Sequence, residues 1–325
     1  MSYILLFILL FAAELAYFKV ADHFNIIDKP NERSSHTTVT LRGGGIIFYI
    51  GILFYFIFNG FQYPWFFLGL TLISVISFAD DIHPRSNKLR LIVHFIAMGL
   101  MFYEWNLFSF PWYFSIIALI ICTGILNAYN FMDGINGITG GYSLVVTAAL
   151  WYINSYQIQF IDNELIYALL SAIIVFNFFN FRTKAKCFAG DVGAISIAFI
   201  VIFLLGKLII ETADYSYIVL LVVYGVDTVL TIIHRLILKE NIFEAHRKHA
   251  YQLMANELKI PHVFVSLFYT FSQLAIVAGF IAFQTYSYWY FLVVTLALST
   301  GYVCLKRKYF YLHKMTPAPP VCNEG

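Results

Sequence analysis

Long apolar stretches alternate with short polar segments along most of the chain. Each apolar stretch is roughly 17–22 residues long, enough for an α-helix to cross about 30 Å of hydrocarbon. The pattern therefore predicts an all-α polytopic membrane bundle of about eleven transmembrane helices, with ten as the alternative. The predicted spans are 3–22, 43–60, 62–79, 90–108, 110–127, 137–154, 164–181, 192–211, 215–234, 263–283 and 287–305.

The composition agrees with a chain that is embedded in a membrane. Hydrophobic residues make up 61% of the 325 residues and charged residues only 12%, which excludes a sizeable soluble domain. The N-terminus has neither a basic leader nor a small-residue cleavage site, so we interpret 3–22 as a span rather than a signal peptide. We predict one integral-membrane catalytic domain over 1–305 and a basic cytoplasmic tail over 306–325.

The basic residues are distributed unevenly between the two ends of the predicted bundle. The loops after the odd-numbered spans and the C-terminal tail hold 18 of the 20 Lys and Arg residues, whereas the other loops hold none. Because Lys and Arg favour the cytoplasmic side, we predict the N-terminus outside and the C-terminus inside. The cytoplasmic segments with candidate chemistry are 23–42, 80–90, 127–137, 181–193 and 236–262.

The segment Asn127-Ala-Tyr-Asn-Phe-Met-Asp-Gly-Ile-Asn-Gly137 stands between two long apolar runs. Its amides and carboxylate cannot face lipid without partners. Glycine lets backbone N–H groups approach a ligand, and Asp and Asn oxygens can hold a cation. Taken alone, the segment is equally compatible with a helix cap followed by a turn.

Two segments nearer the N-terminus carry opposite charges. The first loop runs from Asp28 to His36 and on to Gly45, with two Arg and three consecutive Gly, and such groups bind phosphate oxygens. Asp80 and Asp81 repel each other unless a cation lies near, so they suit a proton acceptor or Mg²⁺ support. The alternatives are a solvated basic loop and a pair of helix-end carboxylates in water.

Two further segments complete the set. Gly190-Asp-Val-Gly193 places a carboxylate just before a predicted helix, where a metal-bound phosphate could be held, and Phe188 could stack on a base or simply pack. His246-Arg-Lys-His249 is a dense donor cluster. It lacks the Glu and the third ligand of a zinc site, so phosphate contact is the better interpretation.

Glu14 and Asp227 are carboxylates that lie well inside predicted spans rather than at their ends. Such groups usually face the interior of the bundle and are paired there. For Asp227 we expect a basic partner near the cytoplasmic end and a structural role. Glu14 either faces the interior or lies near the outer interface.

The five polar segments all fall on the predicted cytoplasmic face. Carboxylates for a divalent ion, cations for phosphates and a glycine-loosened backbone are what phosphoryl transfer requires, because positioning and charge neutralisation supply most of its rate. The prediction is an enzyme that acts at the membrane surface on a lipid substrate. The rival interpretation is a transporter, with Glu14, Lys207 and Asp227 on an ion path. Against it, the sequence shows no internal repeat, and its polar residues gather at one face instead.

In this order, the five segments resemble those of the polyprenyl-phosphate N-acetylhexosamine-1-phosphate transferases, and the resemblance covers about Asp28 to Gln252. It implies an EC 2.7.8-type phosphotransferase that moves a HexNAc-1-phosphate from a UDP-sugar to undecaprenyl or another polyprenyl phosphate and releases UMP. It also implies Mg²⁺, with Mn²⁺ as the alternative ion, and a bacterial cytoplasmic membrane. No nucleic-acid partner is expected, and a homodimer is left open.

The resemblance also assigns roles to residues. Asp191 and Asn130 are expected to hold the metal, and either Asp80 or Asp81 to act as the base, whether the transfer is direct or passes through a covalent intermediate. With these two, Asp133 and His246 complete the catalytic set. The expected substrate-binding residues are Arg33, Ser34, His36, Arg42, Gly43, Lys88, Asn127, Asn136, Asn180, Phe188, Arg247 and His249.

Departures from the family pattern bear on the donor sugar. The Glu244-Ala-His-Arg-Lys-His249 form of the last loop is similar to the branch that initiates O-antigen or capsule repeat units. That branch implies UDP-GlcNAc or a UDP-6-deoxy-HexNAc as donor and a role in building a cell-surface polysaccharide such as lipopolysaccharide. The alternative within the family is the phospho-MurNAc-pentapeptide transferase of peptidoglycan synthesis. Asn136 replaces an Asp that is usual in bacterial members, and an amide can also pair with a uracil edge.

Overall fold

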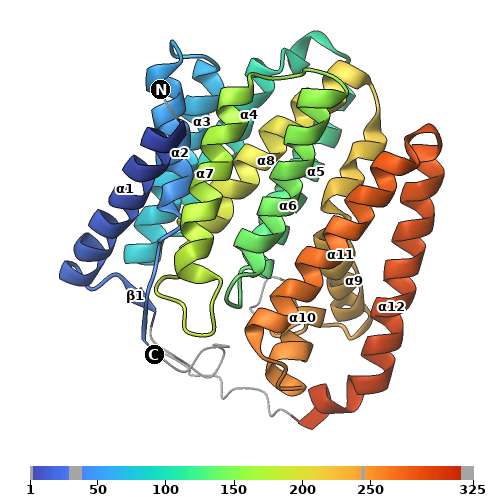
Figure 1. Cartoon of the computed structure of the whole chain (residues 1–325). Coiled ribbons are helices and arrows are strands. Elements are labelled where there is room, and N and C mark those ends of the chain that lie inside the picture. The colour runs from blue at the N-terminus through green and yellow to red at the C-terminus, as the bar shows by residue number, and fades with distance from the viewer. Residues whose placement is uncertain (1–2, 29–38, 243–245, 316–325) are drawn as a thin grey trace.

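The structure, a computed structural model, describes residues 3–28, 39–242 and 246–315. These residues form a bundle of long helices (Figure 1). The elements are α1 (Tyr3–His23), β1 (Ile27–Asp28), β2 (Thr40–Leu41), α2 (Ile46–Phe58), α3 (Pro64–Ile82), α4 (Asn87–Glu104), η1 (Leu107–Ser109), α5 (Trp112–Met132), α6 (Ile138–Tyr156), α7 (Asn163–Asn180), α8 (Gly190–Thr212), η2 (Tyr215–Leu221), α9 (Val222–Ile237), α10 (Ala250–Gln252), η3 (Leu253–Glu257), α11 (His262–Ala282), η4 (Gln284–Tyr286) and α12 (Ser287–Met315).

The all-helical membrane bundle predicted from the sequence is confirmed. Each of the eleven predicted spans coincides with a helix or, for 215–234, with η2 continued by α9. Eight of these segments are long and apolar enough to cross a membrane, and α2 is a shorter apolar helix of 13 residues. The orientation relative to the cytoplasm stays a prediction.

Several helices run further than the apolar pattern indicated. Helix α3 continues to Ile82, and α5 continues to Met132. The segments 80–90 and 127–137 are therefore partly helical rather than loops. A helix can extend beyond the hydrocarbon because its backbone hydrogen bonds are internal, so the change from apolar to polar residues does not end it.

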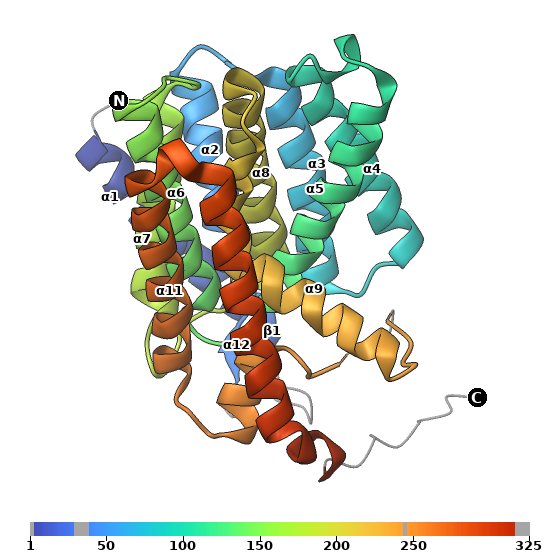
Figure 2. The ribbon, with the colours of Figure 1, turned by 90° about the vertical axis from the view of Figure 1, so that its right-hand side faces the viewer.

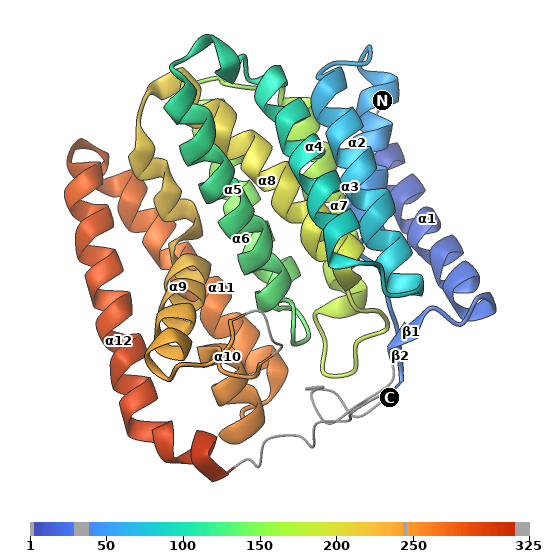
Figure 3. The same cartoon turned by 180° about the vertical axis from the view of Figure 1, so that it is seen from behind.

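Helix α8 lies at the centre of the bundle, where it packs against α2, α3, α5 and α6. In the apolar 18-residue stretch of α8, 78% of the residues are buried, whereas in that of α12 only 6% are buried. Figures 2 and 3 show α12 on the outside, beside α9 and α11. In Figure 1, β1 and α10 lie at the same end of the bundle, opposite the N-terminus. Asp191 lies in the first turn of α8, the most enclosed of these helices.

Candidate active site

The glycine-rich first loop docks onto the turn that precedes α8. Gly44 N donates to the carbonyl of Phe188 at 2.9 Å, and Phe188 N donates to the carbonyl of Leu41 at 2.8 Å. A Cβ on Gly45 would stand 2.2 Å from the Cα of Gly193. The triple glycine thus allows two backbone segments to touch, which places Arg42 beside the start of α8.

Asp81 joins the end of α3 to the start of α8. Its carboxylate accepts from the backbone N–H groups of Asp191 and Val192, both at 2.9 Å. It also forms an ion pair with Arg42, with 2.7 Å between Nε and Oδ1. A carboxylate suits a helix N-terminus, where free N–H groups and the helix dipole stabilise negative charge.

Asp80 and Asp191 share a second cation. Arg90 on α4 contacts Asp80 Oδ2 at 2.9 Å and Asp191 Oδ2 at 3.2 Å, while Arg42 contacts Asp191 Oδ1 at 3.4 Å. We call Asp80, Asp81, Asp191, Arg42 and Arg90 the carboxylate cluster. The structure thus brings together the predicted Asp pair, the predicted metal ligand Asp191 and the predicted phosphate ligand Arg42.

The sequence analysis did not select Arg90 for the site. It named Lys88, which is exposed on the first turn of α4. Helical periodicity distinguishes the two, because Arg90 shares a face with the buried Ala97 and Met101, whereas Lys88 shares one with the exposed Ile92. If the apolar stripe of α4 had been located in the sequence at 3.6-residue spacing, Arg90 would have been recognised as the cation that faces inward.

Asp133 follows α5 and lies within electrostatic range of the carboxylate cluster, where Asp191 and Arg42 act on it. Its Oδ1 accepts from the Thr139 hydroxyl at 2.6 Å. Burial raises the pKa of Asp133 to about 6. Asn127 and Asn130 lie on the last turns of α5, three residues apart, so they share the helix face that leads to Asp133.

Asn136 and Asn180 connect the turn after α5 to the loop after α7. Asn136 Nδ2 donates to the carbonyls of Arg182 and Thr183 at 3.0 and 3.2 Å. Asn180 accepts from Gly137 N at 2.8 Å and donates to the carbonyl of Cys187 at 2.8 Å. Both side chains, predicted to bind substrate, therefore hold the two loops together. Asn136 Oδ1 is buried without a hydrogen-bond partner within the described residues.

Residues 246–249, the histidine segment, are anchored by α9. His249 Nδ1 lies 3.3 Å from Asp227 Oδ1, and Ala250 N donates to the same oxygen at 2.9 Å. Asp227 Oδ2 accepts from the Tyr269 hydroxyl at 2.6 Å. Asp227 and His249 are both buried, so the expected basic partner of Asp227 is His249 itself.

His246 stacks near His249, with 5.0 Å between ring centroids. Burial, reinforced by His249, lowers the pKa of His246 to about 3. The imidazole is therefore uncharged near neutral pH and can serve as a hydrogen-bonding group rather than a cation. Tyr251 links this region to α5 because its hydroxyl donates to the carbonyl of Phe131 at 2.8 Å.

The remaining predicted residues are placed as follows. Gly43 has a φ of +81° and lies against the Tyr17 hydroxyl, which donates to the Arg42 carbonyl at 2.5 Å. Phe188 and Arg247 are partly buried. Arg33, Ser34 and His36 lie outside the described residues.

Glu14 faces the interior of the bundle. It is fully buried, and the Cys187 thiol lies 3.5 Å from its Oε1. Glu14 thus packs behind the first loop rather than in the carboxylate cluster.

The donor set fits a hard divalent cation. Asp80 and Asp191 both contact Arg90, so their negative charges lie close together and favour a nearby cation. Asp80, Asp81, Asp133 and Asp191 carry four negative charges against the two of Arg42 and Arg90, which leaves the charge of one divalent ion to neutralise. Among the described residues, no three His, Cys, Asp or Glu side chains form a complete metal cage. Mg²⁺ commonly uses one or two carboxylates and takes its other ligands from water and substrate phosphates.

Comparison with known proteins places this geometry in a family. Residues 63–209 match the model of glycosyl transferase family 4. This segment belongs to glycosyl transferase family 4. It contains Asp80, Asp81, Asp133 and Asp191, whereas Arg42 and the histidine segment lie outside it. The predicted resemblance is therefore confirmed at the level of the family.

The curated relatives that the chain matches are named transferases. The chain is 30% identical over 207 residues to the undecaprenyl-phosphate alpha-N-acetylglucosaminyl 1-phosphate transferase of Salmonella typhi, covering 58% of this chain and 56% of the relative. The Escherichia coli K12 protein of that name is 29% identical, covering 62% and 60%. A probable undecaprenyl-phosphate N-acetylglucosaminyl 1-phosphate transferase of Bacillus subtilis is 25% identical, covering 73% and 72%. The chain thus spans little more than half the length of the first of these relatives.

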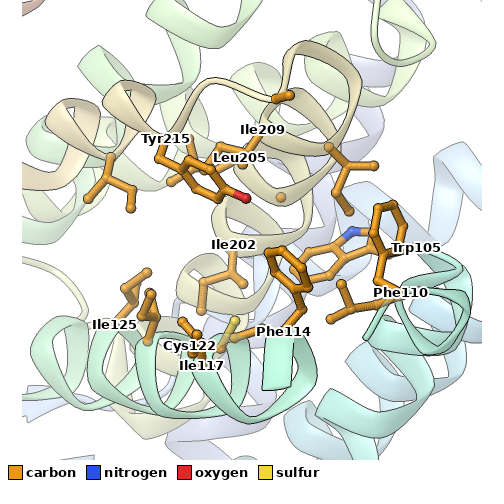
Figure 4. A pocket seen from close by; sticks show the side chains of 17 residues that line it. Trp105, Phe110, Phe114, Ile117, Cys122, Ile125, Ile202, Leu205, Ile209 and Tyr215 are labelled. Atoms are coloured by element: carbon orange, nitrogen blue, oxygen red, sulfur yellow. The ribbon is translucent and has the colours of Figure 1, made fainter. Parts of the chain in front are cut away.

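Two apolar grooves lie along α5. One, of about 200 Å³, lies between α5 and α8 and is lined by Trp105, Phe114 and Ile202 among others (Figure 4). A second, of about 520 Å³, lies between α5 and α9 and reaches Ala128 and Tyr129. Both are lined by Ile121, Ile125 and Ile218, so they adjoin. Together they follow α5 towards the end that carries Asn130 and Asp133.

Proposed function

We propose that this protein transfers a HexNAc-1-phosphate from a UDP-sugar to a polyprenyl phosphate, with release of UMP. The observation that carries the proposal is the carboxylate cluster. Four segments distant in the sequence bring three aspartates and two arginines to one end of a membrane bundle. A cluster of that charge at a lipid surface suits two phosphate-bearing substrates, one water-soluble and one anchored in the bilayer.

The residues of the carboxylate cluster have different proposed roles. Arg42 and Arg90 are positioned to take phosphate oxygens when substrate enters, because guanidinium groups bind phosphate in the same geometry as carboxylate. Asp81 already accepts hydrogen bonds from the N-terminus of α8, so its proposed role is structural. Asp80 is the better candidate for readying the acceptor phosphate, since it is less buried than Asp81.

Asp191, with Asp80 beside it, would hold Mg²⁺, and Asn130 is the further ligand that the sequence predicts. The ion supplies charge neutralisation at the diphosphate when it is bound. His246, uncharged near neutral pH, and His249, held by Asp227, are the proposed hydrogen-bond donors to the same phosphates. The buried Asn136 Oδ1 and Phe188 are the proposed contacts for the uracil ring.

The adjoining apolar grooves along α5 are the proposed path of the acceptor's hydrocarbon chain. A polyprenyl chain needs a long apolar surface that leads to the site and opens to lipid. The α5 grooves provide this, because they are lined almost wholly by aliphatic and aromatic side chains. Burial of isoprene units there contributes binding at about 25 cal/mol per Å² of apolar surface.

The proposal is tested by UMP release. The purified full-length protein is incubated with undecaprenyl phosphate and Mg²⁺ and with UDP-GlcNAc, a UDP-6-deoxy-HexNAc or UDP-MurNAc-pentapeptide in separate reactions. We expect UMP and a lipid-linked diphosphate sugar with UDP-GlcNAc or the 6-deoxy sugar. Turnover with the pentapeptide donor alone would move the chain to peptidoglycan synthesis. An absence of UMP with every donor would refute the transferase, as a transporter would give none.

A further inference from the structure

A separate groove lies between α9 and α12, near the end of the bundle that carries the polar site. Its volume is about 430 Å³. Its apolar wall is formed by Leu230, Ile233, Ile237 and Val303, and its basic side by Lys306 and Arg307. The α9 residues are spaced three and four apart, so they form one stripe facing α12. The groove is therefore amphipathic along its length.

The groove opens towards lipid. Only 6% of the residues in the apolar stretch of α12 are buried, and α9 lies beside α12 at the edge of the bundle (Figure 2). Ile233, Ile237 and Val303 are exposed within the described structure. Lys306 and Arg307 follow the apolar part of α12, which is the depth of lipid headgroups. Basic pockets between transmembrane helices at this depth bind acidic lipid headgroups.

We propose that this groove binds an anionic phospholipid, with its headgroup at Arg307 and Lys306 and one acyl chain along the α9 stripe. The surrounding charges favour an anion. His234, which also lines the groove, lies within electrostatic range of Lys306, Lys248 and Glu240. Glu240 is neutralised by ion pairs with Arg235 and Lys248, so it does not oppose an acidic headgroup.

Buried side chains separate the groove from His249, which argues against its being the acceptor site. Its wall residue Tyr302 hydrogen-bonds to Thr231 at 2.8 Å, and Thr231 donates to Asp227 at 3.2 Å. These buried side chains stand between the groove and His249. A phosphate bound at Arg307 is thus separated from the proposed reacting groups by a layer of protein.

Lys306 couples the groove to the histidine segment. Its ammonium group donates to the carbonyl of Lys248 and lies 5.5 Å from the centre of the Tyr302 ring. A headgroup at Lys306 would therefore add to the interactions that order residues 246–249. This lipid site does not depend on the transferase proposal, and lipid binding can be measured in its absence.

The test uses native mass spectrometry of the purified full-length protein with dioleoylphosphatidylglycerol and dioleoylphosphatidylcholine in equal amounts. We expect one phosphatidylglycerol to be retained in preference to phosphatidylcholine. Arg307→Gln should weaken phosphatidylglycerol binding about fivefold, the effect of one basic residue near a membrane surface. Lys308→Gln is the matched control, since Lys308 is an exposed cation on the next residue that does not line the groove. It should change binding less than twofold, within the scatter of surface charge effects.

A second variant tests the apolar half of the groove. Ile233→Trp adds bulk to the exposed stripe and should abolish the preference for phosphatidylglycerol without unfolding the protein. Equal losses in Arg307→Gln and Lys308→Gln would show diffuse surface charge and overturn the proposal. So would retention of the lipid in Ile233→Trp. Displacement by undecaprenyl phosphate, but not by excess phosphatidylglycerol or inorganic phosphate, would assign the groove to the acceptor instead.

Discussion

Two polar assemblies at the same end of the bundle are built on opposite principles. In the carboxylate cluster, Asp80 and Asp191 lie side by side and share Arg90. Around Asp227, a single carboxylate receives donors from His249, Ala250, Tyr269 and Thr231. The first assembly has more negative charge than its own cations neutralise, whereas the second is saturated. The difference indicates that the first is open to a cation and to phosphates, and that the second holds the histidine segment in place.

The largest expected effect, and the strongest test of this comparison, is the replacement of Asp191. Asp191→Asn keeps the shape of the side chain but removes a charge that the metal requires. We expect UMP release to fall at least about 1000-fold, the upper range for loss of one preorganised electrostatic contact. The thermal unfolding temperature should stay close to that of the wild type. Asp214→Asn, at the start of η2, is the control and should stay active. Full activity in Asp191→Asn would refute the metal assignment.

Substitutions around Asp227 should lower the stability of the protein and not only its activity. Asp227→Asn leaves His249 and Tyr269 without a charged acceptor, and breaking a buried pair costs about 3–5 kcal/mol. We expect a large drop in the unfolding temperature, measured by intrinsic fluorescence in detergent. Tyr269→Phe removes one donor only and should cost about 1 kcal/mol. Equal effects of the two variants would contradict a saturated, charge-centred assembly.

Arg90 and Lys88 allow an inward-facing cation and an exposed cation of α4 to be compared directly. Arg90→Gln removes the cation that Asp80 and Asp191 share, so we expect kcat/KM to fall roughly 10–100-fold, as for groups that orient metal ligands. The Mg²⁺ dependence should shift as well. Lys88→Gln removes the same charge from the exposed face, and its effect should be smaller and fall mainly on KM for the UDP-sugar. A larger effect at Lys88 would show that the exposed cation serves the phosphates.

The smallest expected effect concerns Asp133 and pH. Burial raises its pKa to about 6, above the usual value near 4, so the folded state binds this proton more tightly than the unfolded state. Its contribution to stability is therefore present below pH 4 and is lost as the pH rises through 6. Asp133→Asn removes this dependence. Unfolding temperatures measured in EDTA should show the variant gaining on the wild type between pH 4 and 6, with a constant difference above that range.

A flat difference across that pH range would show that Asp133 is not desolvated. Thr139→Val provides a control. It removes the hydroxyl that donates to Asp133 but leaves the carboxylate in place. The loss of stability should then extend to a higher pH than in the wild type, because that hydrogen bond lowers the pKa of Asp133.

The sequence by itself determined the helical membrane bundle and the kinds of residue at its polar end. Apolar runs long enough to span hydrocarbon permit only helices there, because backbone groups must be satisfied within the segment. Sequence analysis found Asp80 and Asp81 because adjacent carboxylates repel each other unless a cation lies near. It found Asp191 because this carboxylate stands just before a predicted helix. It also predicted that Asp227 is paired.

The tertiary structure decided which of these residues meet. That Asp81 accepts from the α8 backbone, that Asn136 and Asn180 tie two loops together, and that His249 is the partner of Asp227 all depend on contacts between distant segments. Span length and charge counts fix which residues lie at an end of the bundle, but not which helices are neighbours. Helix packing settles that, through side-chain shape and the close approach that Gly45 and Gly193 allow.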